Sequence, residues 1–428
     1  MPLPRRDCLR QGAALLALPI ATPFWSGGVA PAIRRAPLRV NGNRLNAALA
    51  AFDSIGRTAT GINRVGYSDA DLAGRAFTLD LYRQAGLAPR IDAAGNIVAR
   101  VDGTDASRPP IVIGSHVDSV TDGGNFDGPL GSFAAIEVAR TLREQNVRLR
   151  HPLDVVVWQN EEGGTIGSKL YIGELTDAEL DQTARSGLTI RQGIAKIGGD
   201  VACYLELHIE QGGNLEAGGL RIGTVQGIVG LRWFEITVTG FANHAGATPM
   251  DRRQDAMLAA ARFTVAVNEA VRSVPGRQVA TVGRVTVSPN TTNVIPGQVV
   301  LTVDLRDLDQ SVIERFTTRF EALGREIGAA TDTTFAFARL VDSEPALAHA
   351  QVMDWVDASA DALGLSRQRM PSGAGHDAQE VTRIAPMGMI FVPSVGGISH
   401  SPKEFTKPED CVNGADVLLN AVLAADGG

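Results

Sequence analysis

The stretch IVIGSHVDSVTDGGNFDGPLG, residues 111–131, decides the fold, because an apolar run changes there into a loop rich in glycine and aspartate. Apolar β-formers that end in Gly, Asp and Asn indicate a buried strand that opens into a loop. His116, one of seven histidines in the chain, lies at this change. Loops at strand ends commonly carry binding and chemical groups, so we expect a functional site here.

The segments around this stretch predict an α/β domain with a mainly parallel sheet flanked by helices. Apolar runs at 90–101, 109–116, 153–162 and 203–212 alternate with amphipathic runs such as 131–146. Such alternation is typical of parallel strands whose crossover helices cover the sheet. The carboxyl-terminal edge of the sheet is then the expected place for the site.

Residues 229–342 follow a different pattern, which predicts an inserted domain with the ferredoxin-like order βαββαβ. Apolar and polar residues alternate between residues 234 and 239, as an antiparallel sheet with one buried face requires. The first pattern returns over residues 343–428. We therefore expect the chain to leave a first domain, residues 40–228, and to come back to complete it.

The N-terminus indicates an export signal. An arginine pair at residues 5 and 6 precedes a short apolar stretch and the small-residue sequence Ala30-Pro31-Ala32. A membrane anchor is the alternative, but Pro19 and Pro23 interrupt the apolar stretch, which is too short to span a bilayer. We expect residues 1–32 to be a twin-arginine-type signal, so that the protein reaches the periplasm or the exterior and meets the membrane only during export.

The composition is that of a globular protein. The 428-residue chain has 44% hydrophobic residues and a net charge of −7, so it can bury large cores and has no basic surplus to attract nucleic acid. If the signal is removed, Cys203 and Cys411 remain, which is too few for a disulfide framework. Whether these two cysteines pair stays open.

Side chains that can bind metals follow four of the predicted strands. They are His116, Asp118 and Asp127 after the first, Glu161 and Glu162 after the second, His208 and Glu210 after the third, and His400 after the last. Nitrogen and oxygen ligands without thiolate suit catalytic zinc, with manganese, cobalt or nickel as alternatives. A single such residue in a loop is more often a cap or a surface residue, and the recurrence at strand ends is what favours a metal site. Adjacent carboxylates repel each other and point different ways, so one of Glu161 and Glu162 can bind metal while the other moves protons.

Seven motifs resemble, in order, those of the two-metal amidohydrolases related to aminoacylases and carboxypeptidases. They are GSHVDSVTDGGNFDGPLG, NEEGG, ELHIEQG, NHAGATPMDRRQDA, NTTNVIPGQ with DLRD, PSGAGHDAQ and FVPSVGGISHSPKE. The resemblance spans about residues 45–424 and is to the branch of N-carbamoyl-L-amino-acid hydrolases, β-ureidopropionases and allantoate amidohydrolases. It implies a catalytic α/β domain and a smaller lid domain that pairs two subunits into a homodimer.

The resemblance also implies a role for each motif residue. Two divalent metal ions per subunit would be bound, one by His116 and His208, the other by Glu162 and His400, and both by Asp127. Asp118 would orient His116, Glu161 would be the general base, and His244 would reach the active site of the partner subunit. The substrate would be bound by Gln211, Asn293, Arg306 and the backbone of Gly373, Ala374 and Gly375. The alternatives are a structural His244 in a Gly-rich turn, and an Arg306 that pairs with Asp304 and Asp307.

The implied reaction is hydrolysis of the carbamoyl amide bond of an N-carbamoyl-L-amino acid or an N-carbamoyl-β-amino acid, giving amino acid, carbon dioxide and ammonia. The alternatives are an allantoate amidohydrolase, an N-acyl-amino-acid amidohydrolase or dipeptidase, and, outside enzymes, a periplasmic solute-binding protein. Thr165-Ile166 stands where relatives commonly have Arg-Phe, and Trp233 where allantoate-cleaving relatives tend to have arginine. We therefore expect a carbamoyl amino acid rather than allantoate as substrate.

Overall fold

The computed structural model of the protein describes residues 36–92, 94–172 and 201–427, and the described residues from Pro37 onward belong to one compact unit. The predicted signal, residues 1–32, lies outside the described residues. Among the helices of the described ranges, none combines the length and the apolar character that a bilayer crossing needs.

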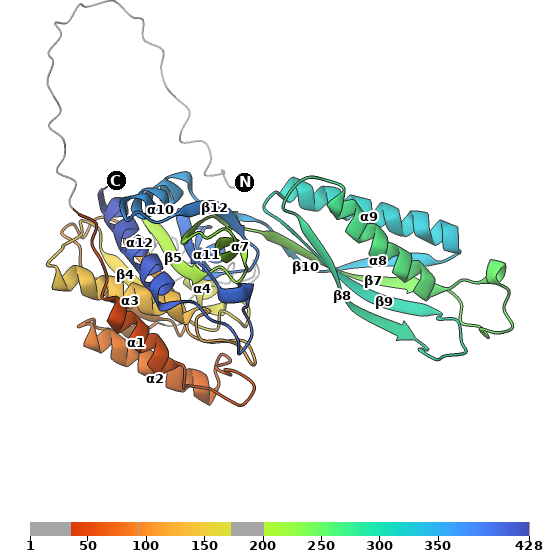
Figure 1. Ribbon diagram of the computed structural model, residues 1–428, viewed down its shortest axis with the longest axis horizontal. Helices are drawn as coiled ribbons and strands as arrows, with labels where there is room; N and C mark the ends of the chain where they lie inside the picture. Colours follow the sequence, from red (N-terminus) through yellow and green to blue (C-terminus); the bar gives the residue numbers. More distant parts are fainter. Residues whose placement is uncertain (1–35, 93, 173–200, 428) are drawn as a thin grey trace, which may run out of the picture. The chain divides into compact units, whose positions relative to one another are not determined.

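The larger of the two sheets in the described residues has nine strands (Figure 1). They are β1 (Arg90–Ile91), β2 (Ile97–Val101), β3 (Ile111–His116), β4 (Leu153–Trp158), β5 (Cys203–Ile209), β6 (Ile222–Ile228), β11 (Ala346–Leu347), β12 (Arg367–Ser372) and β13 (Met387–Val392). The order is β1-β2-β4-β3-β5-β13-β6-β11, and β12 pairs with β6. The four central strands β4, β3, β5 and β13 are parallel, which confirms the predicted α/β fold with a mainly parallel central sheet.

Helices cover both faces of this sheet, and every residue of its four central strands is therefore buried. One core contains Ile111 and Ile113 and packs against α1 (Gly42–Phe52), α2 (Asp69–Gln84), α3 (Pro129–Glu144), α10 (Ala350–Ala362) and α12 (Pro408–Gly427). The core on the opposite face contains Val112 and Tyr204 and packs against α4 (Ile166–Tyr171), α7 (Asn214–Ala217) and α11 (Asp377–Val381). Adjacent residues of one strand thus enter different cores, as the pleat requires.

The smaller sheet has the order β10-β7-β9-β8 and is antiparallel throughout. Its elements are β7 (Gly230–Thr239), α8 (Ala256–Arg272), β8 (Val279–Ser288), β9 (Gln298–Asp307), α9 (Gln310–Thr331) and β10 (Thr334–Ser343). Figure 1 shows α8 and α9 side by side on one face of the sheet, where Phe234, Ile236 and Phe320 are buried. The chain order is therefore strand-helix-strand-strand-helix-strand, while the division into domains and the lid or dimer role stay predictions.

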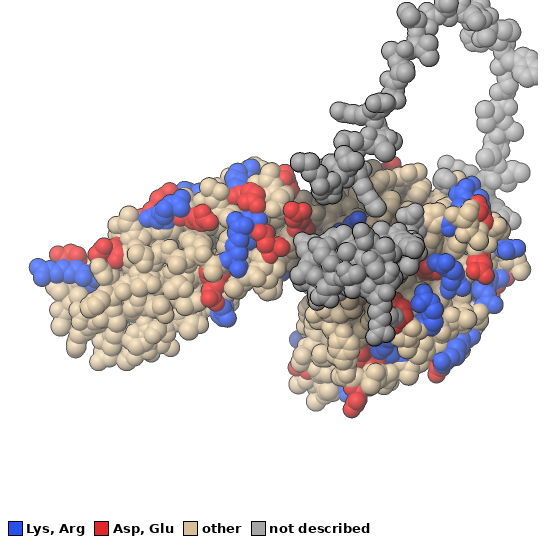
Figure 2. All heavy atoms as spheres, turned by 180° about the vertical axis from the view of Figure 1, so that it is seen from behind, with Lys and Arg blue, Asp and Glu red and all other residues tan. Residues whose placement is uncertain are grey.

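Short elements and single side chains complete the fold. Two 3-10 turns, η1 (Met250–Arg252) and η2 (Val395–Gly397), lie in loops. Cys203 and Cys411 are both buried and do not pair with each other. Figure 2 shows acidic and basic side chains intermingled on one face of the described residues. That nucleic acid is not a partner stays a prediction.

Candidate active site

The predicted metal ligands come together at the carboxyl-terminal edge of the parallel strands. They are His116 at the end of β3, Asp127 in the loop between β3 and α3, Glu162 after β4, His208 in β5, and His400 in the loop after β13. Because β4, β3, β5 and β13 are consecutive neighbours, their carboxyl ends lie next to one another. The fold thus collects residues that are almost 300 positions apart in the chain.

Two groups of ligand atoms share Asp127. His116, Asp127 and His208 form the first group, and Asp127, Glu162 and His400 form the second; within each, the ligand atoms lie within 4.8 Å of one another. Oδ1 of Asp127 is 3.6 Å from Nε2 of His116 and 2.9 Å from Nε2 of His208. Its Oδ2 is 3.2 Å from Nε2 of His400. The two oxygens of one carboxylate therefore face different groups, which is the geometry of a bridging ligand.

Hydrogen bonds determine which nitrogen of each buried histidine is free. Nδ1 of His208 lies 2.9 Å from the carbonyl oxygen of Ile209, and Nδ1 of His116 lies 3.2 Å from that of Asp118. A carbonyl oxygen only accepts, so each Nδ1 carries the proton and each Nε2 has a free lone pair. Within the described part of the chain, the buried Nε2 of His208 and the buried Oε1 of Glu162 have no hydrogen-bond partner. Nε2 of His208 lies 2.9 Å from Oδ1 of Asp127, and lone pairs on both atoms repel each other unless both bind the same cation. These residues therefore fit a metal site.

Burial and neighbouring charges shift the pKa values of the carboxylates. Burial raises the pKa of Glu161 well above its usual range. Burial and the negative charge of Asp127 raise the pKa of Glu162 to about 7. Burial also opposes the ionisation of Asp127, but the neighbouring imidazoles of His208, His116 and His400 hold its pKa well below the usual range. A divalent cation would favour the ionised form of all three carboxyl groups.

Asp118 lies next to His116, and its role in orienting that ring stays a prediction. Its Oδ1 is 3.6 Å from Nδ1 of His116. The backbone carbonyl of Asp118 accepts from that nitrogen. The two carboxylate oxygens accept the backbone N–H groups of Glu161 and Glu162, each at 3.2 Å. Asp118 thus connects the loop after β3 with the loop after β4.

Several predicted substrate residues line a cavity of about 550 Å³ that also includes His400. They are Gln211, Arg306, Gly373 and Ala374. Nε2 of Gln211 donates to Oδ2 of Asp127 at 2.7 Å. Arg306 pairs with Asp304, as one alternative predicted, with Nε–Oδ1 at 2.9 Å and Nη2–Oδ2 at 2.8 Å, and its Nη1 donates to the carbonyl of Gly373 at 2.7 Å. Arg306 therefore lines the cavity with part of its charge already compensated.

His244, Asn293 and Gly375 are not among the residues that line this cavity. His244 is exposed in the loop after β7, where its Nδ1 accepts N–H groups of Gly246 and Ala247 at 3.0 and 3.2 Å. The carbonyl of Asn293 accepts the N–H of Ala245, so Asn293 and His244 lie close together. These hydrogen bonds fit a turn-fixing histidine, and a role in a partner subunit stays a prediction.

Two residues that the sequence interpretation did not single out contact the ligands. Glu404 accepts the backbone N–H of Asp127 at 3.1 Å, and Ser399 donates to Glu404 at 2.9 Å. Both belong to the motif around His400, but a glutamate and a serine in a loop give no signal of their own. Their partners become visible only when the loop conformation is known.

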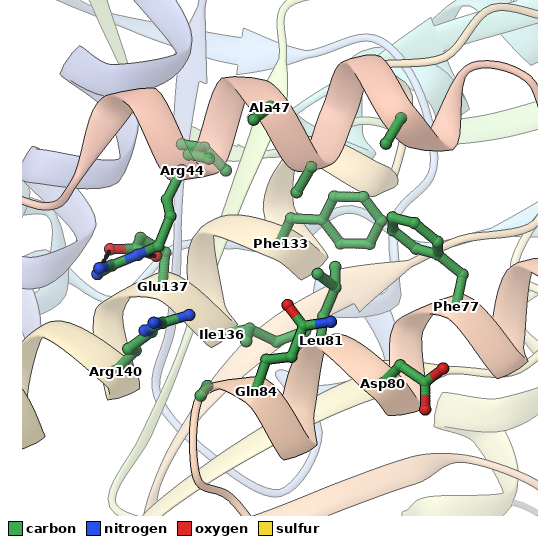
Figure 3. Close-up of a pocket in the computed structure, with 14 residues that line it drawn as sticks. Arg44, Ala47, Phe77, Asp80, Leu81, Gln84, Phe133, Ile136, Glu137 and Arg140 are labelled. Carbon is green, nitrogen blue, oxygen red and sulfur yellow. Dashed lines mark hydrogen bonds and ion pairs between the residues drawn. The ribbon is translucent and has the colours of Figure 1, made fainter.

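A second cavity, of about 530 Å³, lies between α1, α2 and α3 (Figure 3). Phe77, Leu81 and Phe133 form its apolar part, and Arg44 pairs with Glu137 at its rim, with Nη2–Oε1 at 2.6 Å. None of the ligand residues lines it. This cavity is therefore separate from the candidate active site.

Comparison with known proteins agrees with this geometry. Residues 112–424 match Peptidase family M20/M25/M40. The chain is 37% identical over 402 residues to the N-carbamoyl-L-amino acid amidohydrolase of Geobacillus stearothermophilus, with 90% of this chain and 98% of the relative covered. It is 34% identical over 377 residues to the allantoate amidohydrolase of Escherichia coli (strain K12), with 84% and 92% covered. The crystal structure of an amidase of the hydantoinase/carbamoylase family from Burkholderia multivorans matches with a TM-score of 0.83 at 37% identity, with 91% and 99% covered.

The chain therefore belongs to peptidase family M20/M25/M40, and the predicted family resemblance is confirmed. Like these relatives, it is an enzyme of the amidohydrolase class. The alternative of a solute-binding protein without chemistry is wrong.

Proposed function

We propose that the protein hydrolyses the carbamoyl amide bond of an N-carbamoyl-L-amino acid or an N-carbamoyl-β-amino acid. The observation that carries this proposal is the pair of ligand groups that share Asp127, with Glu161 next to them. The substrate class is supported by relatives named N-carbamoyl-L-amino-acid amidohydrolase from several bacteria, at 32 to 37% identity.

The two ligand groups suit two divalent cations. Imidazole nitrogens and carboxylate oxygens are ligands for zinc, the first expectation, and for manganese, cobalt or nickel. When bound, such cations supply Lewis acidity that polarises a carbonyl group and lowers the pKa of a water molecule. Asp127 would bind both cations. His116 and His208 would bind one cation, and Glu162 and His400 the other.

Glu161 is the proposed general base. Its Oε2 lies 3.8 Å from Nε2 of His116, and the residue is 9% exposed. Its carboxylate would take a proton from the attacking water and pass it to the leaving nitrogen. The water oxygen bonds to the carbamoyl carbon, and the bond from that carbon to the amino-acid nitrogen breaks. The carbamate that is released decomposes to carbon dioxide and ammonia.

The cavity beside His400 would hold the rest of the substrate. Asp304 and Gly373 accept three of the five N–H groups of Arg306, so the remaining two would donate to a carboxylate, and Gln211 offers an amide group. The N–H of Ala374 already donates to Oγ of Ser372 at 3.2 Å, so the backbone N–H of Gly373, which lines the cavity, and that of Gly375 beside it are the ones that would donate to an anion. We further propose that His244 and Asn293 act on the site of a partner subunit in a homodimer, where His244 would donate a hydrogen bond to the carbonyl oxygen.

Ammonia release from N-carbamoyl amino acids by zinc-loaded protein tests the proposed reaction. Glu161→Gln should lower kcat at least about 100-fold, because the general base is lost, while the zinc content stays unchanged. Glu137→Gln is the matched control, because Glu137 is a buried carboxylate at the separate cavity, and it should keep the wild-type rate. Unchanged turnover of Glu161→Gln would contradict the assignment of the base.

A substrate panel separates the members of the family. N-carbamoyl α- and β-amino acids should have a higher kcat/KM than allantoate, ureidoglycolate and N-acetyl amino acids. Allantoate and ureidoglycolate belong in the panel because two relatives are named allantoate amidohydrolase and ureidoglycolate hydrolase. A higher kcat/KM for allantoate, ureidoglycolate or N-acetyl amino acids would overturn the proposed substrate. The assignment to the amidohydrolase class would still hold.

A further inference from the structure

Glu404 connects two loops that carry proposed ligands. The residue is 7% exposed. Its Oε1 accepts the backbone N–H groups of Phe126 at 2.9 Å and of Asp127 at 3.1 Å. Its Oε2 accepts the hydroxyl of Ser399 at 2.9 Å. One carboxylate thus bonds to the residue that both ligand groups share and to the residue directly before His400.

The packing around Glu404 holds this carboxylate in place. A Cβ atom on Gly124 would lie 2.2 to 2.3 Å from atoms of the Glu404 side chain, so a larger residue at position 124 would displace it. The rings of Phe126 and Phe405 pack edge to face with centroids 5.8 Å apart, next to the hydrogen bonds. The N–H of Glu404 donates to the carbonyl of Ser401 at 2.9 Å. Polar and apolar contacts therefore fix the two loops against each other.

His400 depends on its loop more than the other proposed histidine ligands do. Its side chain is 51% exposed, whereas those of His116 and His208 are 1% exposed. The latter two belong to strands β3 and β5, but His400 lies in a loop and has a φ of +50°, a conformation that L-residues rarely adopt. Nε2 of His400 contacts Asp127 at 3.2 Å, Gln211 at 3.3 Å and Glu162 at 3.9 Å, all within the site itself. Its backbone is held from outside the site through the neighbouring Ser399, which donates to Glu404.

We propose that Glu404 is a positioning residue that keeps His400 and Asp127 at the separation needed to bind the second cation. It would set the affinity of the group formed by Asp127, Glu162 and His400, and have little effect on the group of His116, Asp127 and His208. The inference rests on the proposed metal-dependent function. Hydrogen-bond partners behind metal ligands typically change metal affinity by about 10- to 100-fold.

Titration of the metal-free protein with Co²⁺, followed by calorimetry and visible absorption, tests this role. In Glu404→Ala the first Co²⁺ should bind with the wild-type Kd, and the Kd of the second should rise about 10- to 100-fold. In Glu404→Gln the Kd of the second Co²⁺ should lie between those of the wild type and Glu404→Ala, because the amide oxygen still accepts the N–H groups of Phe126 and Asp127. Glu137→Gln is the control: Glu137 is also buried and accepts a backbone N–H, that of Asn41, and both Co²⁺ ions should bind as in the wild type.

Equal weakening of both cations, or no change in either, would overturn the proposal. Circular dichroism shows whether Glu404→Ala folds, and if it does not, the isosteric Glu404→Gln decides alone. A wild-type protein that binds no divalent cation would refute the proposed metal-dependent function, and this inference would fall with it. The two failures are distinguishable because one appears in the wild type and the other only in the variants.

Discussion

At the scale of single residues, Gly128 shows how tightly the backbone is packed against a proposed ligand. Gly128 precedes α3 and has a φ of +82°. A Cβ atom at this position would lie 2.5 Å from Cε1 and Nδ1 of His116. Only glycine combines this backbone conformation with this close approach to the ring.

Gly128→Ala should lower both stability and metal affinity. Gly364→Ala is the matched control, because Gly364 has a φ of +71° and a Cβ there would meet no atom within 4 Å. The control should lose about 1 kcal/mol of unfolding free energy from the left-handed conformation alone. Gly128→Ala should lose more, because the His116 ring must also move, and its first Co²⁺ should bind more weakly.

Urea unfolding and Co²⁺ titration measure the two effects. If the two variants lose equal stability and bind Co²⁺ alike, the contact between Gly128 and the His116 ring has no energetic role.

At the scale of secondary-structure elements, the central strands could be predicted because their sequences are continuous apolar runs between turn residues. β3, β4, β5 and β13 are such runs, and the residues that follow them form the ligand groups. β6 and β12 were not predicted: β6 contains Gly223 and Gly227, and β12 has the polar sequence RQRMPS. β6 joins the sheet by pairing with β13, and β12 joins it by pairing with β6, and single-sequence periodicity does not contain such pairing.

The contacts between loops could not be predicted for a related reason. The side chains of Asp118 and Glu404 accept backbone N–H groups from other loops. Such bonds depend on the loop conformation and not on the type of residue that donates. The residue types at strand ends thus indicated a metal site, while the groups that orient its ligands required the structure.

At the scale of the whole molecule, the proposed homodimer predicts that His244 acts on the site of the partner subunit. The ligand groups lie at the edge of the nine-stranded sheet, and His244 belongs to the loop after β7 of the four-stranded sheet. Co-expression of Glu161→Gln with His244→Ala tests the proposed homodimer. In a mixed dimer, one site would combine Glu161 of one subunit with His244 of its partner.

Random pairing makes half of the dimers mixed, each with one complete site of two, so about one quarter of the wild-type activity should return. Each variant expressed alone should be almost inactive. If activity does not return in verified mixed dimers, His244 does not act across the subunit interface.

The central claim of this account is that distant segments bring two cations together around Asp127. Anomalous X-ray diffraction at the zinc edge from crystals of zinc-loaded protein tests this claim most directly. We predict two anomalous peaks that share Asp127, one next to His116 and His208 and the other next to Glu162 and His400. No peak at these residues, or zinc bound only elsewhere, would contradict the account.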